Sequence, residues 1–320
     1  MTTSESRYDL ATGSNGPELS IIVTAHNCEA YLEQCLNSIL TPADELYSTC
    51  EIILIDDSSE DSTPDICQRF SRKHLNITFH QVKFRNIGKV RNFALEQCSG
   101  QYVTMVDGDD QIIPGALSDI LRELRERKPD VLLTRLNEVY GNAQTNNIWN
   151  GLAALPITRH EAITKFLVHR ELQAHFIGQF FRRAILSGLK FPEFRCYEDA
   201  YLFPFVLAKS ESILFSRTGP YLYFKRAGSL SAKIDAEKVS MLVKATEQME
   251  VAFGKGYGNL IACHWINIQH KHRADIRDER DRLSVRKALK QVSAISFVCD
   301  PQVRMSFKKK YLKLRFRGAF

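Results

Sequence analysis

Short apolar runs alternate with helical patterns over the first 140 residues of the chain. In the helical segments, apolar residues recur every three to four positions. Strands separated by helices of this length form right-handed crossovers, which place the strands parallel in one sheet with helices on both faces. The pattern predicts strands at 19–24, 50–55, 76–84, 102–106 and 131–137, and helices at 29–40, after Ser62-Thr63-Pro64, at 88–98 and at 115–128.

The alternation stops after Tyr140, and the second half of the chain reads differently. Residues 141–152 (GNAQTNNIWNGL) resemble a loop, and from Ile234 the pattern is mainly helical and highly charged. Between them the sequence indicates helices at 160–170, 178–187 and 197–208 and short strands at 212–215 and 221–224. We therefore expect a flexible tail (1–18), an α/β domain (19–232) and a helical region (233–320) that ends in a basic amphipathic tail.

The composition is that of a globular protein. Of the 320 residues, 44% are hydrophobic and 25% are charged, which excludes a wholly disordered or fibrous chain. No apolar run approaches the roughly 18 residues that span a bilayer, and the N-terminus lacks a signal pattern. The eight cysteines show no metal-binding spacing, so we expect free thiols. These features predict a cytoplasmic protein, either soluble or peripheral on the cytoplasmic membrane face.

The positive charge of the chain is concentrated in its last twenty residues. The net charge is +6, but residues 301–320 hold seven basic residues and no acidic one, and the rest carries 36 basic against 37 acidic residues. Leu312 and Phe316 lie opposite Phe307, Tyr311 and Leu314 on a helix, although strand-like alternation fits the tail equally well. Because the rest of the chain is close to neutral, this tail favours an anionic surface over a nucleic-acid partner. Cations beside aromatic residues suit an anionic membrane surface, and the alternative is a solvated tail. The seven are Arg304, Lys308, Lys309, Lys310, Lys313, Arg315 and Arg317.

Four polar turns follow the predicted strands. In an open parallel sheet, ligands bind beyond the carboxyl ends of the strands, so these turns are expected to share one edge. Asp, Asn, Ser and Gly are also common in ordinary turns and helix caps, which explains any single turn but not all four. The turns are Thr24-Ala25-His26-Asn27, Asp56-Asp57-Ser58-Ser59-Glu60-Asp61-Ser62, Arg85-Asn86-Ile87-Gly88-Lys89-Val90-Arg91-Asn92 and Asp107-Gly108-Asp109-Asp110.

The fourth turn places three carboxylates at the tip of a very apolar strand, where their mutual repulsion is costly. A hard divalent cation offsets that charge and keeps coordination positions for phosphate oxygens, so Mn²⁺ or Mg²⁺ is the expected cofactor. Lys89 and Arg91, one turn away, are placed to hold a diphosphate. The sequence has neither GxGxxG after the first strand nor GxxxxGK[ST], which disfavours a dinucleotide-binding dehydrogenase and a P-loop enzyme.

Five motifs in order carry a family resemblance. They are LSIIVTAHNCEAYLEQCLNSIL, EIILIDDSSEDST, NIGKVRNFALEQCSGQYVTMVDGDD, YEDAYLFPFVL and YLYFKRAGSLS, spread over residues 19–232. In this order they resemble the motifs of family 2 inverting glycosyltransferases of GT-A fold, of the type that builds bacterial surface polysaccharides. The resemblance implies a Rossmann-like, mostly parallel sheet flanked by helices, followed here by a mainly helical extension.

The resemblance also implies a donor site. The donor would be a nucleotide sugar, most often a uridine diphosphate sugar, with a metal bound at the fourth turn. By this resemblance Asp109 is the direct metal ligand, and Asp107 and Asp110 belong to the same metal motif. The implied donor-binding residues are Ala25, His26, Asn27, Asp56, Asp57, Asn86, Gly88, Lys89, Arg91, Asp107, Gly108, Lys225 and Arg226.

The same resemblance assigns the catalytic pair to Glu198 and Asp199, with Asp199 as the general base. Inversion at an anomeric carbon needs a carboxylate that takes the proton of the attacking hydroxyl. Without the resemblance, two acids at a helix N-terminus are explained by the helix dipole alone. The sequence thus predicts a metal-dependent transferase that acts on a glycan or lipid-linked acceptor. The alternatives are a sugar-nucleotide-binding protein without activity and a basic nucleic-acid-binding protein.

Overall fold

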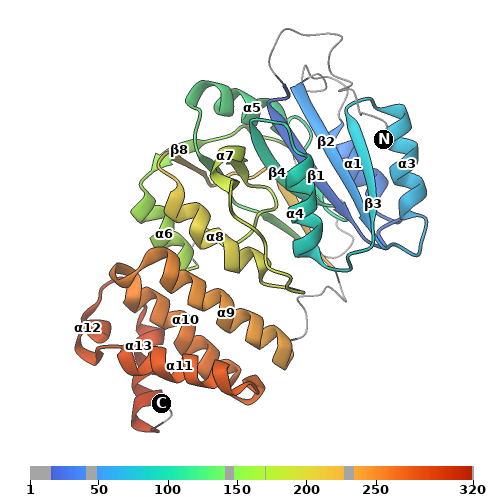
Figure 1. Cartoon of the computed structure of the whole chain (residues 1–320). Helices are drawn as coiled ribbons and strands as arrows, with labels where there is room; N and C mark the ends of the chain where they lie inside the picture. Colours follow the sequence, from blue (N-terminus) through green and yellow to red (C-terminus); the bar gives the residue numbers. More distant parts are fainter. Residues whose placement is uncertain (1–15, 41–48, 141–147, 170, 227–233, 319–320) are drawn as a thin grey trace.

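The computed structural model of the chain describes residues 16–40, 49–140, 148–169, 171–226 and 234–318. Most of the expected N-terminal tail and the expected domain boundary at residue 232 lie outside these residues. The described part is an α/β domain followed by a group of helices (Figure 1). The division into 19–232 and 233–320 therefore stays a prediction.

The core is an eight-stranded sheet, as the alternating pattern predicts. Parallel pairs join β1 to β2, β1 to β4, β2 to β3 and β6 to β10, so the sheet is mostly parallel. All eight residues of β2 are buried, because helices cover both faces of the sheet. The order across the sheet is β3 (Ile77–Val82), β2 (Cys50–Asp57), β1 (Leu19–Ala25), β4 (Tyr102–Asp107), β9 (Phe180–Arg182), β6 (Val131–Thr134), β10 (Ile213–Ser216) and β8 (Ala154–Ile157).

Two predictions for the middle of the chain are wrong. Residues 178–187 were expected to be helical, but β9 pairs antiparallel with both β4 and β6, and only a short helix follows it. Phe180 and Phe181 are fully buried in this strand. Two consecutive apolar residues are too few to show whether the hydrophobic pattern repeats with the period of a strand or of a helix. The strand expected at 131–137 is two strands, because the chain leaves the main sheet after Thr134.

A second, three-stranded sheet lies beyond the end of β4. Its central strand β11 (Tyr221–Lys225) pairs antiparallel with β5 (Gln111–Ile112) and parallel with β7 (Asn137–Tyr140). Neither β5 nor β8 was expected from the pattern, since two and four residues are too short to show alternation. This small sheet brings β11 next to the turn that follows β4.

Side-chain caps begin several of the helices. Asn86 accepts a hydrogen bond from the backbone N–H of Lys89 at the start of α4, and Thr158 forms a capping box with Glu161 at α6. α4 packs on β1 and β2, whereas α1 and α3 lie against each other. The helices of the α/β domain are α1 (Leu32–Ile39), α3 (Thr63–Lys73), α4 (Ile87–Gln97), α5 (Ala116–Arg127), α6 (Arg159–Leu167), α7 (Arg183–Leu186) and α8 (Glu198–Lys209).

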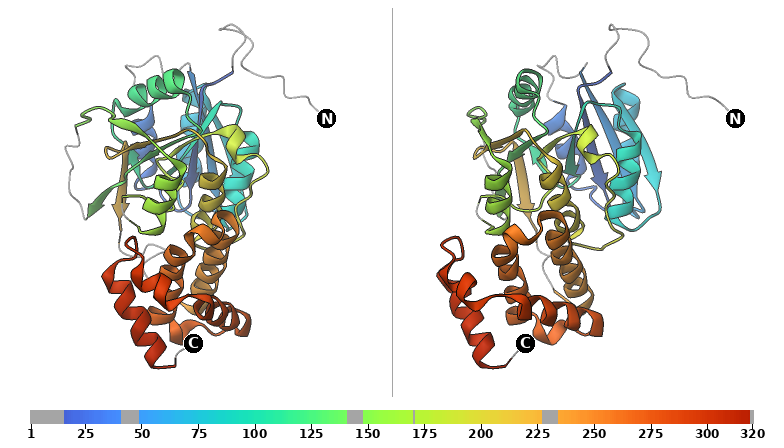
Figure 2. Two further views of the ribbon diagram at one scale, coloured as in Figure 1. Left: turned by 90° about the vertical axis from the view of Figure 1, so that its left-hand side faces the viewer. Right: turned by 60° about the vertical axis from the view of Figure 1, so that its left-hand side comes forward.

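The C-terminal region is helical, as expected, and its helices lie together at one end of the molecule (Figure 2). α9 packs along α8, and α10 contacts α6, so this group continues directly from the α/β domain. The basic tail forms a helix, which settles the choice between helix and strand. The helices are α9 (Ala236–Phe253), α10 (Gly258–Lys271), α11 (Glu279–Gln291), α12 (Ala294–Cys299) and α13 (Met305–Phe316), with 3₁₀ turns at Lys255–Tyr257 and Arg273–Asp275. Within the described ranges, none of the helices has the length and apolar character to span a bilayer.

Candidate active site

The carboxyl ends of β1, β2 and β4 meet at one edge of the sheet. Ala25 pairs in register with Asp56, and Thr24 pairs with Asp107. The turns after these strands were expected to share an edge, and the register brings them together. The Thr24 hydroxyl donates a hydrogen bond to Asp107 Oδ1 at 3.2 Å, which links the first turn to the fourth.

Asp57 organises the turn that follows β3. Its Oδ1 accepts hydrogen bonds from the backbone N–H groups of Phe84 (2.8 Å) and Arg85 (2.9 Å), and its Oδ2 accepts one from Asn86 (3.1 Å). Its backbone carbonyl lies 2.6 Å from His26 Nδ1. Asp57 therefore fixes the shape of two candidate donor-binding turns, and its contact with a nucleoside stays a prediction.

Asn27 joins the first turn to the second. Its backbone N–H donates to Ser59 Oγ at 2.9 Å, and its Oδ1 accepts from the Glu60 N–H at 2.8 Å. Its φ of 48° is left-handed, a conformation that asparagine tolerates better than most residues. Asp56 is fully buried and accepts a hydrogen bond from Gln81, and its Oδ1 has no partner among the described residues. Of this group, His26 and Asn27 are exposed to a ligand, whereas Asp56 lies within the strand.

The third turn docks α4 against the segment 191–194. A Cβ on Gly88 would lie 2.0 Å from the carbonyl oxygen of Pro192, so only glycine fits there. Lys89 Nζ lies 2.9 Å from a carboxylate oxygen of Glu193, and the Asn86 amide donates to the Phe194 carbonyl at 3.4 Å. The structure thus gives these three predicted donor-binding residues a packing role, and their contact with a donor stays a prediction.

Arg91 is the centre of the site. Its side chain is only 5% exposed, and one guanidinium nitrogen, Nη1, donates to Glu198 Oε1 at 2.7 Å and to Asp199 Oδ1 at 2.5 Å. Its Nη2 lies 3.7 Å from Asp107 Oδ1. Burial alone lowers the pKa of Arg91, but the three carboxylates raise it above its ordinary value. The structure therefore joins the predicted phosphate-binding arginine, Asp107 of the fourth turn and the predicted catalytic pair in one cluster.

Glu198 and Asp199 open α8. The preceding residue Tyr197 has a φ of 64°, which turns the chain into the helix, and the Phe176 N–H donates to Asp199 Oδ2 at 3.1 Å. Burial and the charge of Asp199 raise the pKa of Glu198 to about 7, although Arg91 lowers it. Burial also raises the pKa of Asp199, against the opposing effect of Arg91. Two carboxyl groups with raised pKa values beside one cation are typical of a site for proton transfer.

The three aspartates of the fourth turn differ in their surroundings. Asp110 is 1% exposed, and its oxygens accept hydrogen bonds from the Tyr221 hydroxyl (2.7 Å) and the Phe224 N–H (2.9 Å). Burial, with the charges of Asp107 and Asp109, raises the pKa of Asp110 to about 8. The side chains of Asp107 and Asp109 are 33% and 43% exposed. Asp107 and Asp109 are therefore the carboxylates available to a ligand, and Asp110 ties the turn to β11.

This turn fits a divalent cation that also binds phosphate. The described residues contain no group of three or more His, Cys, Asp or Glu side chains arranged to hold a metal by themselves. Mg²⁺ in nucleotide sites is commonly held by one or two carboxylates, and substrate phosphates and water complete its shell. Asp107 and Asp109 supply that number of carboxylates.

Lys225 and Arg226 reach this edge from the end of β11. Arg226 Nη1 lies 2.8 Å from Asp109 Oδ2, and its guanidinium carbon stands 4.0 Å from the centre of the Tyr31 ring. Lys225 Nζ instead lies 3.3 Å from Glu138 and 4.2 Å from the ring centre of Tyr223. Of the two predicted clamps, Arg226 is the one in contact with the fourth turn, Asp107-Gly108-Asp109-Asp110.

Several residues of the site have no signal in the sequence. Tyr221 links Asp107 to Asp110, Tyr31 lies under Arg226, and Phe176 binds Asp199 through its backbone. His175 lies beside this cluster; burial and the charges of Lys225 and Arg91 lower its pKa to about 4. Tyr31 and Tyr221 lie within two of the quoted motifs, but the contacts of these residues join distant parts of the chain, and the sequence does not reveal them.

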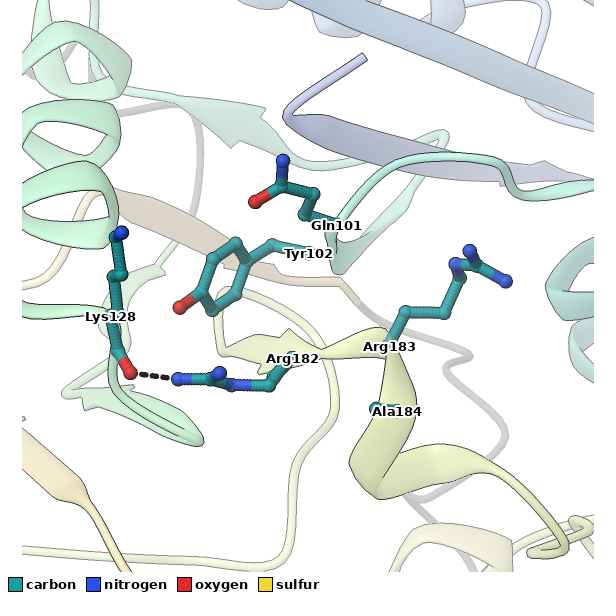
Figure 3. A pocket seen from close by; sticks show the side chains of 6 residues that line it. All are labelled: Gln101, Tyr102, Lys128, Arg182, Arg183 and Ala184. Atoms are coloured by element: carbon teal, nitrogen blue, oxygen red, sulfur yellow. Dashed lines mark hydrogen bonds between the residues drawn. The ribbon is translucent and has the colours of Figure 1, made fainter. Parts of the chain in front are cut away.

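A hollow of about 260 Å³ lies at the other end of β4 (Figure 3). Tyr102, the first residue of that strand, lines it together with Lys128 and Arg182, and Arg182 donates to the Lys128 carbonyl. Asp107 is the last residue of the same strand. The hollow is therefore not part of the candidate active site at the carboxyl edge of the sheet.

An open, mostly parallel sheet with helices on both faces and carboxylates clustered at its carboxyl edge has the arrangement of a GT-A fold. The fold matches the solved structure of Staphylococcus aureus TarS residues 1–349 in complex with UDP-GlcNAc, with a TM-score of 0.66, 23% identity, and coverage of 93% of this chain and 85% of that one. The model named Glycosyl transferase family 2 matches residues 20–188, and the chain belongs to that family.

Curated relatives agree with the family. Glycosyltransferase GlyA of Streptococcus pneumoniae serotype 4 is 26% identical over 248 residues, which cover 75% of this chain and 35% of GlyA. Glycosyltransferase GlyG of the same organism is 24% identical over 66% of this chain and 72% of GlyG. The poly(ribitol-phosphate) beta-N-acetylglucosaminyltransferase TarS of Staphylococcus aureus is 33% identical over 138 residues, or 42% of this chain and 24% of TarS. The matched region thus spans about a third of GlyA and a quarter of TarS.

Proposed function

We propose that this glycosyltransferase moves a sugar from a nucleotide sugar, with inversion at the anomeric carbon, to a glycan or lipid-linked acceptor. The observation that carries the proposal is the buried cluster in which Arg91 joins Asp107 to Glu198 and Asp199. It sets the predicted base next to the turn predicted to hold the leaving diphosphate. A protein that only bound a sugar nucleotide would need the donor edge but not the buried acid pair.

Asp199 is proposed as the general base. The acceptor oxygen attacks the anomeric carbon while the bond from that carbon to the diphosphate oxygen breaks, and Asp199 takes the hydroxyl proton. Its raised pKa favours acceptance of this proton. Arg91 and the Phe176 N–H hold its two oxygens, so the carboxylate has a fixed orientation.

The proposed cofactor is Mn²⁺ or Mg²⁺, held by Asp109 and Asp107. When bound, such a cation stabilises the negative charge that builds on the departing diphosphate. Exposure of both carboxylates at the tip of β4 supports this assignment. The Asp110 oxygens are engaged by Tyr221 and Phe224, which makes Asp110 a support for the turn rather than a first ligand.

A uridine diphosphate sugar is the proposed donor. The motif resemblance favours it, and two of the matching TarS structures are complexes, one with UDP-GlcNAc and one with UDP. Several relatives carry names from cell-surface polymers, among them a minor teichoic acid biosynthesis protein of Bacillus subtilis. These names support a role in the assembly of a surface polysaccharide or glycolipid.

The test is transfer and donor hydrolysis across a panel of sugar nucleotides, with Mn²⁺, with Mg²⁺ and with a chelator. We expect metal-dependent turnover of one donor, lost at least a hundredfold in Asp199→Asn with donor affinity retained. Asp281→Asn is the matched control, because Asp281 is also a buried acid in the first turn of a helix. Donor binding without turnover in the wild type would favour the non-catalytic alternative, and an absence of donor binding would refute the proposal.

We further propose that α13 meets an anionic membrane surface, where a lipid-linked acceptor would lie. Phe307, Tyr311 and Leu314 turn inward, and Tyr311 is fully buried. The outward face carries Met305, Lys309, Leu312 and Phe316 at helical spacing. Apolar side chains between lysines on an exposed face suit the headgroup region of an anionic bilayer.

Vesicle co-sedimentation tests this surface. The protein should bind vesicles that contain phosphatidylglycerol and not pure phosphatidylcholine, and Phe316→Ser should weaken binding several-fold. Ile295→Ser is the matched control, since Ile295 is equally exposed but lies on α12. Equal binding to both vesicle types would contradict the membrane proposal, and binding to RNA or DNA instead would favour the nucleic-acid alternative.

A further inference from the structure

Arg226 holds the carboxylate that is proposed to bind the metal. Its Nη1 contacts Asp109 Oδ2 at 2.8 Å and lies 3.8 Å from Asp110 Oδ1. The same nitrogen donates to the Phe224 carbonyl at 3.4 Å, and the guanidinium stacks over Tyr31. Arg226 is thus held by Nη1 and by the Tyr31 ring, and it carries the charge that balances Asp109.

A guanidinium at this position competes with a divalent cation. Both need the oxygens of Asp109, and both are positive, so they repel each other at short range. Among the described residues, the other cation in ion-pair contact with this turn is Arg91, at 3.7 Å from Asp107. Loss of Arg226 would therefore leave three neighbouring carboxylates with much less compensating charge.

We propose that Arg226 is a positioning residue that holds Asp109 through their ion pair before the cation binds, and that this ion pair breaks when the cation binds Asp109. A nucleoside diphosphate would then strengthen cation binding in two ways, because it supplies phosphate ligands and gives Arg226 another anionic partner. The inference rests on the metal site of the proposed function, and it adds a coupling between metal and donor that runs through one side chain. Such coupling is reciprocal for binding free energies.

The experiment measures Mn²⁺ affinity directly, by calorimetry or by the electron paramagnetic resonance of free Mn²⁺, with and without UDP. Arg226→Gln should bind Mn²⁺ alone about tenfold more tightly than the wild type. Arg226→Lys should lie between the two. UDP should strengthen Mn²⁺ binding by a smaller factor in Arg226→Gln than in the wild type.

Lys225→Gln is the matched control. It removes an equal charge one residue away, but Lys225 pairs with Glu138 and not with the aspartates. We expect its affinity for Mn²⁺ alone to stay within about twofold of the wild type, because the nearer Arg226 charge remains.

Two results would overturn the inference. The first would leave the proposed metal site intact, and the second would also refute the metal-dependent function. If Arg226→Gln binds Mn²⁺ no more tightly than the wild type while UDP still promotes binding in both, the coupling through Arg226 is wrong and the metal site remains. If no form of the protein binds Mn²⁺ even with UDP, the metal-dependent function and the inference are both wrong.

Discussion

Tyr221 holds the shape of the turn Asp107-Gly108-Asp109-Asp110, which is proposed to bind the metal. Its hydroxyl accepts a hydrogen bond from the Asp107 N–H at 3.0 Å and donates one to Asp110 Oδ2 at 2.7 Å. The ring is fully buried, so water cannot replace either bond. A single hydroxyl thus connects two aspartates of the turn to β11.

Tyr221→Phe should lower the free energy of unfolding by about 1–3 kcal/mol, because a buried N–H and a buried carboxyl lose their partner. Urea denaturation gives the value. Tyr140→Phe is the control: its hydroxyl also meets a carboxylate, Glu138, but the side chain is exposed, and a change within about 0.5 kcal/mol is expected. Equal effects of the two substitutions would show that Tyr221 does not support the turn.

Glu198 should make stability depend on pH. Its pKa is raised from 4.5 to about 7 in the folded protein, mainly by burial and by Asp199, against the effect of Arg91. The folded state therefore binds the proton more tightly than the unfolded state, and stability falls as pH rises from about 4.5 through 7.

The Glu198→Gln side chain cannot lose a proton, so this variant should lack that part of the fall. Denaturation of both proteins from pH 5 to 8 should show the wild type losing roughly 2–3 kcal/mol relative to the variant. Parallel curves over this range would mean that Glu198 is ionised at all these pH values in the folded protein.

At the scale of residues, the sequence predicts which residues lie at the carboxyl edge of the sheet. It does not predict which residues they contact. Asp107 and Asp109 lie at the end of an apolar strand, and Arg91 lies near the start of α4, so their position could be predicted. The bond from Arg91 to Asp199 joins residues 108 apart, and nothing in either motif specifies it. The same holds for Arg226 and Asp109, which meet only because β11 lies beside the turn after β4.

At the scale of elements, the contact between α4 and the segment 191–194 sets the distance from Arg91 to the acid pair. Gly88 allows the close approach, and the Asn92 side chain bonds the Phe191 backbone at 2.9 and 2.8 Å on the same side. A side chain at position 88 must push the segment away. The orientation of α4 thus depends on the absence of one methyl group.

Gly88→Ala should cost about 1–3 kcal/mol in stability through overpacking and should lower the transfer rate more than tenfold, because Arg91 shifts from Glu198. Thermal unfolding and turnover with a fixed donor check both. Gly256→Ala is the control, since a Cβ there meets no atom within 4 Å. Normal activity in Gly88→Ala would show that the segment moves without disturbing the site.

The central strands are well predicted, because buried parallel strands are continuous apolar runs between turn residues. β9 is not, since its three residues gain their strand form from pairing with β4 and β6 on both sides. Tertiary contacts, not local preference, decide such short elements.

At the scale of the whole molecule, α13 is both a part of the C-terminal core and a candidate contact surface. Tyr311 packs against Phe297 with ring centres 4.9 Å apart, and its hydroxyl donates to the Val292 carbonyl. Deletion of the tail would therefore remove core side chains along with surface ones. Point substitutions separate the two roles.

Tyr311→Ala should lower the stability of the protein by about 3–5 kcal/mol, as expected for loss of a buried aromatic side chain. Phe316→Ala, at a residue 87% exposed, should change it by less than about 0.5 kcal/mol. Thermal or urea unfolding compares them. A large loss in Phe316→Ala would mean that the outer face of α13 is covered by the protein itself.

The position of Arg91 in the sequence has a consequence for the protein during its synthesis. Its two acid partners follow it by 107 and 108 residues, so Arg91 is synthesised long before the proposed catalytic pair. Until α8 forms, Arg91 has only the looser contact with Asp107. A chain that ends before α8 lacks the proposed base, and we therefore expect it to show no transfer activity.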